Sequence, residues 1–466
     1  MKKIIAFIII TLVTLPMYAQ DITGQWNGIL NVQGTQLRLV FNITQADKGY
    51  SSTMDSPDQG TKGIPVTSTS YENSILKLEI SNADIQYEGT LDKKNVFVGT
   101  FKQSGQSFPL DLTRGEIEKK LIIRPQEPTK PYSYYSEDVT FKNIKDKIVL
   151  AGTLTLPEKD GNFPAVVLIS GSGPQNRDEE IMGHKPFLVL ANHLTKNGIA
   201  VLRFDDRGTA ESKGDFATAT SLDFATDVKS AIIYLQTRKE INKNQIGLIG
   251  HSEGGIIAPI VAAETKEISF IILLAGTGIR GDQLLLLQQE LIGKSMGVSE
   301  GELQETRSIN KAAFDIVIKS TDTETLKTEL TNYIKQTLKD NPEPEKPAGM
   351  SEADFIKLQV DQLTSRWIQY FIKYDPSPTL EKVKCPVLAI NGEKDLQVSA
   401  KVNLEAIERA LVKGGNKNIT IKELPNLNHL FQECETGSPS EYATTEQTFS
   451  PIALTEITNW IIRQVK

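Results

Sequence analysis

Residues 245–255 read Gln-Ile-Gly-Leu-Ile-Gly-His-Ser-Glu-Gly-Gly, and this stretch decides the fold of the larger part of the chain. Its apolar first half is typical of a buried strand, and the apolar residues after Gly254 continue with a helical pattern. Glycines at 250 and 254 flank Ser252, as a very sharp turn requires, because larger side chains there would collide. Such a turn presents the Ser252 hydroxyl at the end of the strand. The short pattern G-x-S-x-G also occurs by chance, and the strand–turn–helix setting is what favours Ser252 as a nucleophile.

The same alternation of strand and helix extends on both sides of this turn. Apolar runs typical of buried parallel strands lie at 164–170, 199–203, 245–250, 269–274 and 386–390. Helical patterns lie between them, at 185–196, 221–238 and 254–264. This order predicts an α/β fold, with a mostly parallel, doubly wound sheet and helices on both faces, over residues 136–466. Residues 277–381 carry only helical patterns, including one over 352–370, so we expect a helical cap inserted between two strands.

A serine hydroxyl needs a base, which should follow it in the chain. Beyond Ser252 the sequence contains a single histidine, His429, in a loop after a strand-like run at 419–424. The carboxylate that orients this base should lie between the two, at a strand end. Asp395 is preferred and Glu393 is held in reserve, because a turn after Gly392 would bring the third residue back over the sheet edge. The order serine, aspartate, histidine predicts a catalytic triad.

A tetrahedral intermediate also needs two backbone N–H donors for its oxyanion. One is expected from Glu253, at the start of the helix after the nucleophile. The other is expected from the loop Gly-Ser-Gly-Pro at 171–174, where small residues let the backbone approach a substrate. Pro174 has no N–H to donate. Ser172 is therefore preferred as the second donor, and Gly173 is the alternative.

Other polar residues near these loops are expected to be structural. Arg177 and Arg207 follow strand ends, where an arginine can bind a substrate carboxylate, but ties to neighbouring aspartates are favoured. His251 is expected to point away from Ser252. His184 and His193 lie on or near a predicted helix and are expected to be structural or exposed.

The first part of the chain has different patterns. Two lysines, an apolar run at 4–15 and Ala19 predict a signal peptide over 1–19, and hence a periplasmic or extracellular protein; an uncleaved anchor is the alternative. Residues 20–114 alternate with period two, which predicts a small all-β sandwich or barrel. Residues 115–135 are expected to be a proline-stiffened linker.

Composition excludes several classes of protein. Hydrophobic residues make up 39% of the 466-residue chain, enough for a buried core, and the net charge is −7 with a pI near 5.5. An acidic balance argues against nucleic-acid binding. Four histidines and two cysteines make a multi-ligand zinc site or a disulfide scaffold unexpected. We therefore expect no metal, no organic cofactor and no stable membrane insertion, while the oligomeric state stays open.

Residues from about 137 to 466 resemble the α/β-hydrolase superfamily, especially serine aminopeptidase-like, dienelactone hydrolase-like and prolyl oligopeptidase-like domains. The matching segments are 170–174, 206–208, 250–255, 392–395 and 428–429. With the β-rich front domain, the resemblance implies a secreted bacterial two-domain carboxylesterase that acts on a small-molecule ester. A serine exo-peptidase on the same fold is the alternative, and a non-catalytic binding protein is a third reading. Ser170 stands where many relatives carry histidine, and Ala210 departs from the usual loop.

Overall fold

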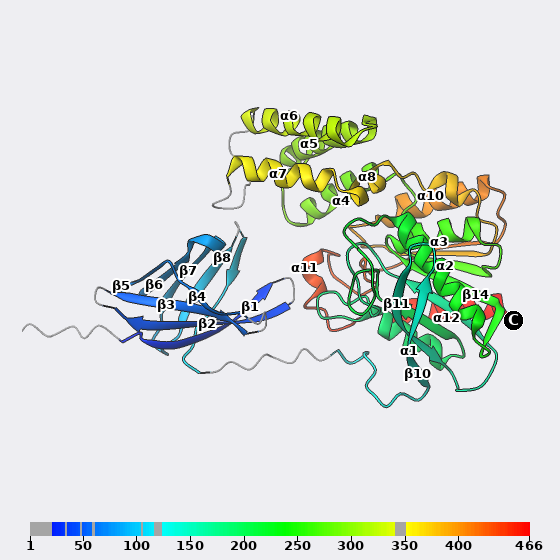
Figure 1. Cartoon of the computed structure of the whole chain (residues 1–466), viewed down its shortest axis with the longest axis horizontal. Helices are drawn as coiled ribbons and strands as arrows, with labels where there is room; N and C mark the ends of the chain where they lie inside the picture. Colours follow the sequence, from blue (N-terminus) through cyan, green and yellow to red (C-terminus); the bar gives the residue numbers. More distant parts are fainter. Residues whose placement is uncertain are drawn as a thin grey trace, which may run out of the picture. The chain divides into compact units, whose positions relative to one another are not determined.

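The computed structural model describes residues 21–32, 35–46, 49–57, 61–103, 106–115, 124–340 and 351–466. They form two compact units, the first holding 21–32 and 36–115 and the second holding 124–340 and 351–466 (Figure 1). The predicted signal peptide and the first part of the predicted linker lie outside the described residues, and they stay predictions.

The first unit consists of antiparallel sheets, because its apolar residues alternate with polar ones along each strand. Its strands are β1 (Gly24–Val32), β2 (Thr35–Gln45), β3 (Tyr50–Ser56), β4 (Thr61–Pro65), β5 (Ser68–Glu72), β6 (Ile75–Ile80), β7 (Ile85–Leu91), β8 (Phe97–Gln103) and β9 (Gln106–Pro109). They pair in the order β1-β2-β3-β4 and β5-β6-β7-β8-β9. The inward-facing residues of both sheets, including Trp26, Phe41 and Phe97, share one apolar core. The predicted all-β domain is confirmed.

The second unit is built on an eight-stranded sheet. Its strands are β10 (Tyr135–Asn143), β11 (Ile148–Leu156), β12 (Phe163–Ile169), β13 (Ala200–Phe204), β14 (Ile241–His251), β15 (Phe270–Leu274), β16 (Val387–Gly392) and β17 (Ile419–Leu424). They pair in the order β10-β11-β13-β12-β14-β15-β16-β17. The first three in this order pair antiparallel and the rest pair parallel. The carboxyl ends of β12 to β17 therefore meet at one edge of the sheet.

Both faces of this sheet are buried. Val166 and Leu168 of β12 pack with α1 (Pro186–Lys196) and α12 (Pro451–Val465). Val167 and Ile169, one position along, pack on the opposite face. That face is covered by α2 (Ser221–Thr237), α3 (Gly254–Glu264) and α10 (Ala400–Lys413). Alternate side chains of one strand thus enter two cores, which is why the strands read as continuous apolar runs.

The helical block lies between β15 and β16. Its helices are α4 (Gly281–Ser295), α5 (Glu300–Lys319), α6 (Thr323–Asp340), α7 (Glu352–Leu363), α8 (Arg366–Lys373) and α9 (Ser377–Leu380). Helices α5, α6 and α7 pack side by side around an apolar cluster that includes Phe314, Leu330 and Val360 (Figure 1). The single helix predicted over 352–370 is wrong, because Ser365 begins a new helix by accepting a hydrogen bond from the N–H of Ile368.

The fold class expected from the sequence is confirmed: a mostly parallel α/β sheet with inserted helices follows an all-β domain. The two antiparallel strands at the sheet edge, β10 and β11, were not predicted. Within the described part of the chain, no helix is both long and apolar enough to cross a bilayer.

Candidate active site

Ser252 occupies the sharp turn between β14 and α3. Its φ is 52°, a left-handed conformation that residues other than glycine rarely adopt. A Cβ on Gly250 would lie 2.0 Å from the carbonyl oxygen of Gly254, and one on Gly254 would lie 2.2 Å from that of Ile169. Only glycine fits at these two positions, as the sequence pattern predicts. The turn leaves Ser252 partly exposed at the carboxyl edge of the sheet.

Asp395 and His429 form a buried pair on the loops after β16 and β17. His429 Nδ1 lies 2.8 Å from Asp395 Oδ2. The other carboxylate oxygen, Oδ1, accepts hydrogen bonds from the backbone N–H groups of Gln397 and Val398, both at 2.8 Å. These two bonds fix the orientation of the carboxylate. A carboxylate oxygen opposite Nδ1 requires the proton on that nitrogen, which leaves Nε2 of His429 able to act as a base.

The two loops are held together by close backbone packing. A Cβ on Gly392 would lie 2.2 Å from the carbonyl oxygen of Leu427, so the turn before Asp395 touches the loop before His429. The buried side chain of Asn428 accepts hydrogen bonds from the N–H groups of Leu430 and Gln432, both at 3.0 Å. The Asp395 loop and the His429 loop thus support each other.

The reserve carboxylate, Glu393, lies elsewhere, with its Oε2 accepting a hydrogen bond from the N–H of Asn426 at 3.0 Å. The strand end that carries Ser252 meets the pair through His251, whose ring centroid lies 4.9 Å from that of His429. The Ser252 hydroxyl itself makes no hydrogen bond to any described residue. Nucleophile–base contacts of this kind are often long without substrate and tighten when it binds.

The loop after β12 offers free backbone donors. The N–H of Gly171 donates to Glu179 Oε1 at 2.7 Å, so it is not available to a substrate. Among the described residues, the N–H groups of Ser172, Gly173 and Glu253 have no acceptor. Gly173 has φ of +91°, so the loop bends sharply at this position. These three N–H groups, which the sequence analysis names as possible oxyanion donors, therefore have no competing acceptor among the described residues.

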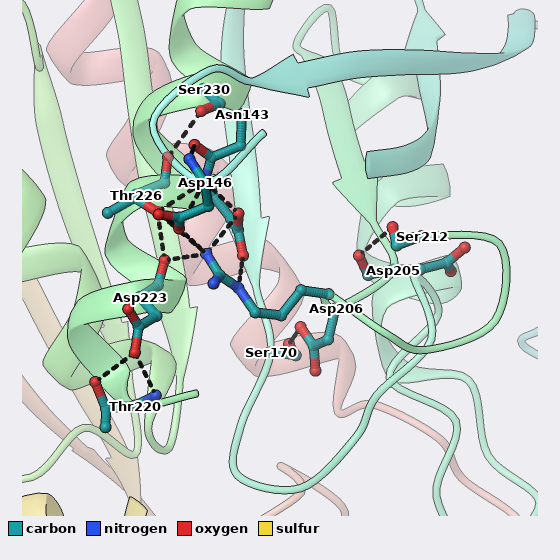
Figure 2. A network of polar contacts seen from close by, with 12 residues as sticks. Asn143, Asp146, Ser170, Asp205, Asp206, Ser212, Thr220, Asp223, Thr226 and Ser230 are labelled. Carbon is teal, nitrogen blue, oxygen red and sulfur yellow. Dashed lines mark hydrogen bonds and ion pairs between the residues drawn. The ribbon is translucent and has the colours of Figure 1, made fainter. Parts of the chain in front are cut away.

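A buried carboxylate supports this loop from behind. Asp206 accepts from the hydroxyl of Ser170 at 2.8 Å and from the N–H of Gln175 at 2.9 Å; Figure 2 shows Asp206 beside Ser170. Burial raises the pKa of Asp206 to about 8, and the two hydrogen bonds offset burial only in part. A protonated Asp206 can equally donate to Ser170, because a hydroxyl also accepts. In the sequence, Asp206 stands out only as part of the matching segment 206–208.

Glu253 contributes a side chain as well as a backbone donor. Its Oε1 accepts hydrogen bonds from the Ser221 hydroxyl at 2.6 Å and from Trp367 Nε1 at 2.8 Å. Trp367 belongs to α8, so this contact ties the helical block to the residue next to Ser252. Burial raises the pKa of the Glu253 carboxyl, while the two hydrogen bonds oppose the rise. Nothing in the sequence signalled this contact.

The arginines near the site are occupied by acidic neighbours, as expected. Arg177 donates to Asp205 at 2.6 Å, and Arg207 donates to Asp227 at 2.7 Å. Around the latter pair, Asn143, Asp146 and Thr226 form a dense polar network, shown in Figure 2. Neither guanidinium is left free for a substrate carboxylate.

The remaining histidine contacts are structural or connect loops. His184 is buried and bonds the Thr448 hydroxyl and the Tyr442 carbonyl. His251 lies between Glu179 and the backbone of His429. No cluster of three or more potential metal ligands occurs among the described residues.

Comparisons with known proteins give a family match and a curated relative. The family model described as X-Pro dipeptidyl-peptidase (S15 family) matches residues 146–410, more than half of the chain. Esterase EstD of Thermotoga maritima is 25% identical over 398 residues, covering 84% of this chain and 80% of the relative.

Two solved structures align with the chain at low identity. The Pyrococcus furiosus esterase Pf2001 aligns with a TM-score of 0.43 at 15% identity, covering 71% of this chain and 93% of that one. Est1E from Butyrivibrio proteoclasticus, with bound ferulic acid, aligns with a TM-score of 0.41 at 15% identity, covering 70% of this chain and 99% of that one. The family match includes β14 with its turn and the loop of Asp395. The chain therefore belongs to the X-Pro dipeptidyl-peptidase (S15) family of the α/β-hydrolase superfamily, and it is a hydrolase.

Proposed function

We propose that the protein is a serine carboxylesterase in which Ser252, His429 and Asp395 act as a catalytic triad. The observation that carries the proposal is the left-handed Ser252 turn beside the 2.8 Å contact between His429 and Asp395 at one sheet edge. A strained, partly exposed serine next to an oriented imidazole is the arrangement that nucleophilic acyl transfer needs. The 25% identity to Esterase EstD over 84% of the chain supports the choice of an ester as substrate.

The reaction follows from these positions. His429 Nε2 takes the proton of the Ser252 hydroxyl while the serine oxygen bonds to the carbonyl carbon of the ester. The resulting oxyanion accepts hydrogen bonds from the N–H of Glu253 and the N–H of Ser172. The tetrahedral intermediate collapses, the C–O bond to the alcohol breaks, and His429 returns the proton to the leaving alkoxide.

Deacylation repeats these steps with water. His429 removes a proton from a water molecule, the hydroxide attacks the acyl carbon, and the carboxylic acid leaves with Ser252 reprotonated. Asp395 keeps the imidazole in the correct tautomer throughout. Nothing in this scheme calls for a metal or an organic cofactor.

Replacing the nucleophile tests the proposal. We expect the wild type to hydrolyse p-nitrophenyl acetate and Ser252→Ala to lose about 10⁴-fold or more in kcat. Ser308→Ala, at an exposed position on α5, is the matched control and should keep wild-type activity. A fluorophosphonate probe should label the wild type and Ser308→Ala but not Ser252→Ala. An unchanged rate in Ser252→Ala would overturn the assignment of this residue.

A serine exo-peptidase is the second candidate, because the matching family model is described as an X-Pro dipeptidyl-peptidase. The same triad would then attack an amide carbonyl, and the leaving group would be an amine. Comparing kcat/KM for Xaa-Pro p-nitroanilides with kcat/KM for p-nitrophenyl esters separates the two. A higher value for the anilides, lost in Ser252→Ala, would replace the esterase proposal with the peptidase. Failure of the probe to label Ser252 would favour a non-catalytic protein.

A further inference from the structure

The side chain of His251 links two loops of the candidate active site. Its Nδ1 lies 2.9 Å from Glu179 Oε1, and its Nε2 lies 3.0 Å from the backbone carbonyl oxygen of His429. Both side chains are buried, with His251 7% and Glu179 3% exposed. Glu179 Oε1 also accepts the N–H of Gly171. A continuous chain of hydrogen bonds therefore runs from Gly171 through Glu179 and His251 to His429.

The two hydrogen-bond partners of His251 determine the protonation state of its ring. A carboxylate oxygen and a backbone carbonyl oxygen are both acceptors, and a neutral imidazole has only one N–H to donate. The two contacts of His251 therefore require one extra proton, placed on the imidazole or shared with Glu179. Burial lowers the pKa of His251, but the charge and hydrogen bond of Glu179, with the His429 carbonyl, outweigh burial and raise it overall.

The backbone of Glu179 is held in an unusual conformation. Its φ is 50°, a left-handed conformation that residues other than glycine rarely adopt. A turn in which the N–H of Glu179 donates to the carbonyl oxygen of Asn176 at 2.8 Å maintains this conformation. Strain of this kind persists where the surrounding structure demands it, and it is concentrated at functional sites.

We propose that Glu179 and His251 are positioning residues. They hold two loops in place relative to Ser252: residues 171–174, called the oxyanion loop, and the loop that carries His429. Glu179 binds the loop of the proposed donor Ser172 through the N–H of Gly171. His251 precedes Ser252 and binds the loop that presents the catalytic base. This Glu179–His251 bridge joins the loops that follow β12 and β17 to the end of β14.

Other charged groups surround the bridge. The Asp395 carboxylate also favours the protonated form of His251, the His429 ring lies against the His251 ring, and Asp206 is close enough to Glu179 for their charges to interact. When the shared proton leaves at high pH, the one remaining N–H stays on Nδ1, opposite the Glu179 carboxylate, and the Nε2 lone pair faces the carbonyl oxygen of His429 at 3.0 Å. The contact then becomes repulsive and the bridge opens. An alkaline loss of kcat is the expected consequence.

Two conservative variants test the bridge, with p-nitrophenyl acetate as the substrate. Glu179→Gln keeps an acceptor for the N–H of Gly171 but removes the charge that holds the extra proton. His251→Gln replaces the two ring nitrogens, which contact two separate partners, with one side-chain amide. We expect kcat to fall by about 10- to 100-fold in each variant, because a shift of roughly 1 Å in the position of these loops has an effect of this size. KM should change less than about threefold. In Glu179→Gln the alkaline limb of kcat against pH should also move to lower pH.

Matched controls isolate the bridge from general effects. Glu180→Gln changes the exposed neighbouring residue in the same way, and His193→Gln changes a histidine on α1 outside the site. Both should keep the wild-type kcat and pH profile. Wild-type kcat and an unshifted alkaline limb in Glu179→Gln would overturn the inference. Should His251→Gln fail to fold, Glu179→Gln alone decides it.

The inference rests on the proposed ester hydrolysis, and the two can fail separately. A wild type without esterase activity would remove the proposed function. An active wild type, an inactive Ser252→Ala and a fully active Glu179→Gln would remove the bridge alone.

Discussion

At the residue scale, the proposed mechanism requires Asp395 to orient His429 and to stabilise the imidazolium that forms during catalysis. Asp395→Asn keeps the size of the side chain but can donate from an amide toward Nδ1, which favours the wrong tautomer of His429. We expect kcat to fall by about 10³- to 10⁴-fold, with the folded structure retained. Steady-state kinetics with p-nitrophenyl acetate and a circular dichroism spectrum measure the two quantities.

Glu393→Gln is the matched control for this change. Its side chain keeps an acceptor for the N–H of Asn426, and the site is exposed, so kcat should stay within about twofold of the wild type. A larger loss in Glu393→Gln than in Asp395→Asn would reverse the assignment of the orienting carboxylate.

The sequence singles out Ser252, Asp395 and His429 as candidates for the triad, but it does not indicate the contact between Glu179 and His251. The first three follow strand ends whose order the alternation of strand and helix predicts, and histidines are scarce enough to leave one candidate base. Glu179 lies within a run of charged residues that has no periodicity. Its contact with His251 depends on the paths of two loops that are 72 positions apart in the chain, which no local pattern encodes.

At the element scale, α8 is tied to the nucleophile turn by the hydrogen bond from Trp367 to the buried Glu253 carboxyl. Trp367→Phe removes the indole N–H but keeps a ring that can stack on Phe371. We expect the unfolding free energy to fall by about 1.5 to 3 kcal/mol, as for a lost hydrogen bond to a charged group. We also expect kcat/KM to fall about tenfold, because Glu253 is then free to shift.

Trp460→Phe is the control for the same substitution in α12. It loses a hydrogen bond to the Thr420 hydroxyl at 3.0 Å, outside the candidate site. Its unfolding free energy should fall, measured by urea titration, while its kcat/KM stays at the wild-type value. Equal kcat/KM values for the two variants would show that the contact of α8 with Glu253 has no role in catalysis.

The elements themselves were predicted best where burial is complete. The central strands and α3 follow from continuous apolar runs, because residues buried on both faces leave an unmistakable pattern. The strand β10 was missed because it lies at the sheet edge, where the apolar pattern weakens. The strand β11 was missed although it is mostly buried, because Gly152, Thr153 and Thr155 interrupt its apolar run. The break between α7 and α8 was missed because a serine that caps a helix and a serine within one look alike without the backbone.

At the scale of the whole molecule, buried acids in the second unit set how stability depends on pH. Asp206 has a pKa of about 8 in the folded protein, against an ordinary value of 3.8, and burial also raises the pKa of Glu253. A raised pKa means that the folded state binds more protons than the unfolded state within this window. The contribution of protonated Asp206 to the free energy of unfolding is therefore fully present below about pH 4, and it is lost as the pH rises through about 8.

We expect the urea midpoint of the second unit to be lower at pH 8.5 than at pH 6. Circular dichroism at 222 nm follows this unit, because its helices dominate the signal while the first unit consists of antiparallel sheets. Asp206→Asn should raise the midpoint at pH 8.5 and reduce the difference between the two pH values. The amide can donate to the Ser170 hydroxyl and accept from the N–H of Gln175, so it reproduces the contacts of the neutral acid.

The net charge of −7 provides a competing explanation, because repulsion among surface carboxylates also changes with pH. Asp160→Asn alters the net charge by the same amount at an exposed site, where the carboxylate pairs with Lys239 at 3.3 Å. It should leave the pH dependence of the midpoint as in the wild type. If Asp206→Asn and Asp160→Asn changed that dependence equally, the effect would belong to overall charge. A reduction in Asp206→Asn alone assigns it to the buried carboxyl behind the oxyanion loop.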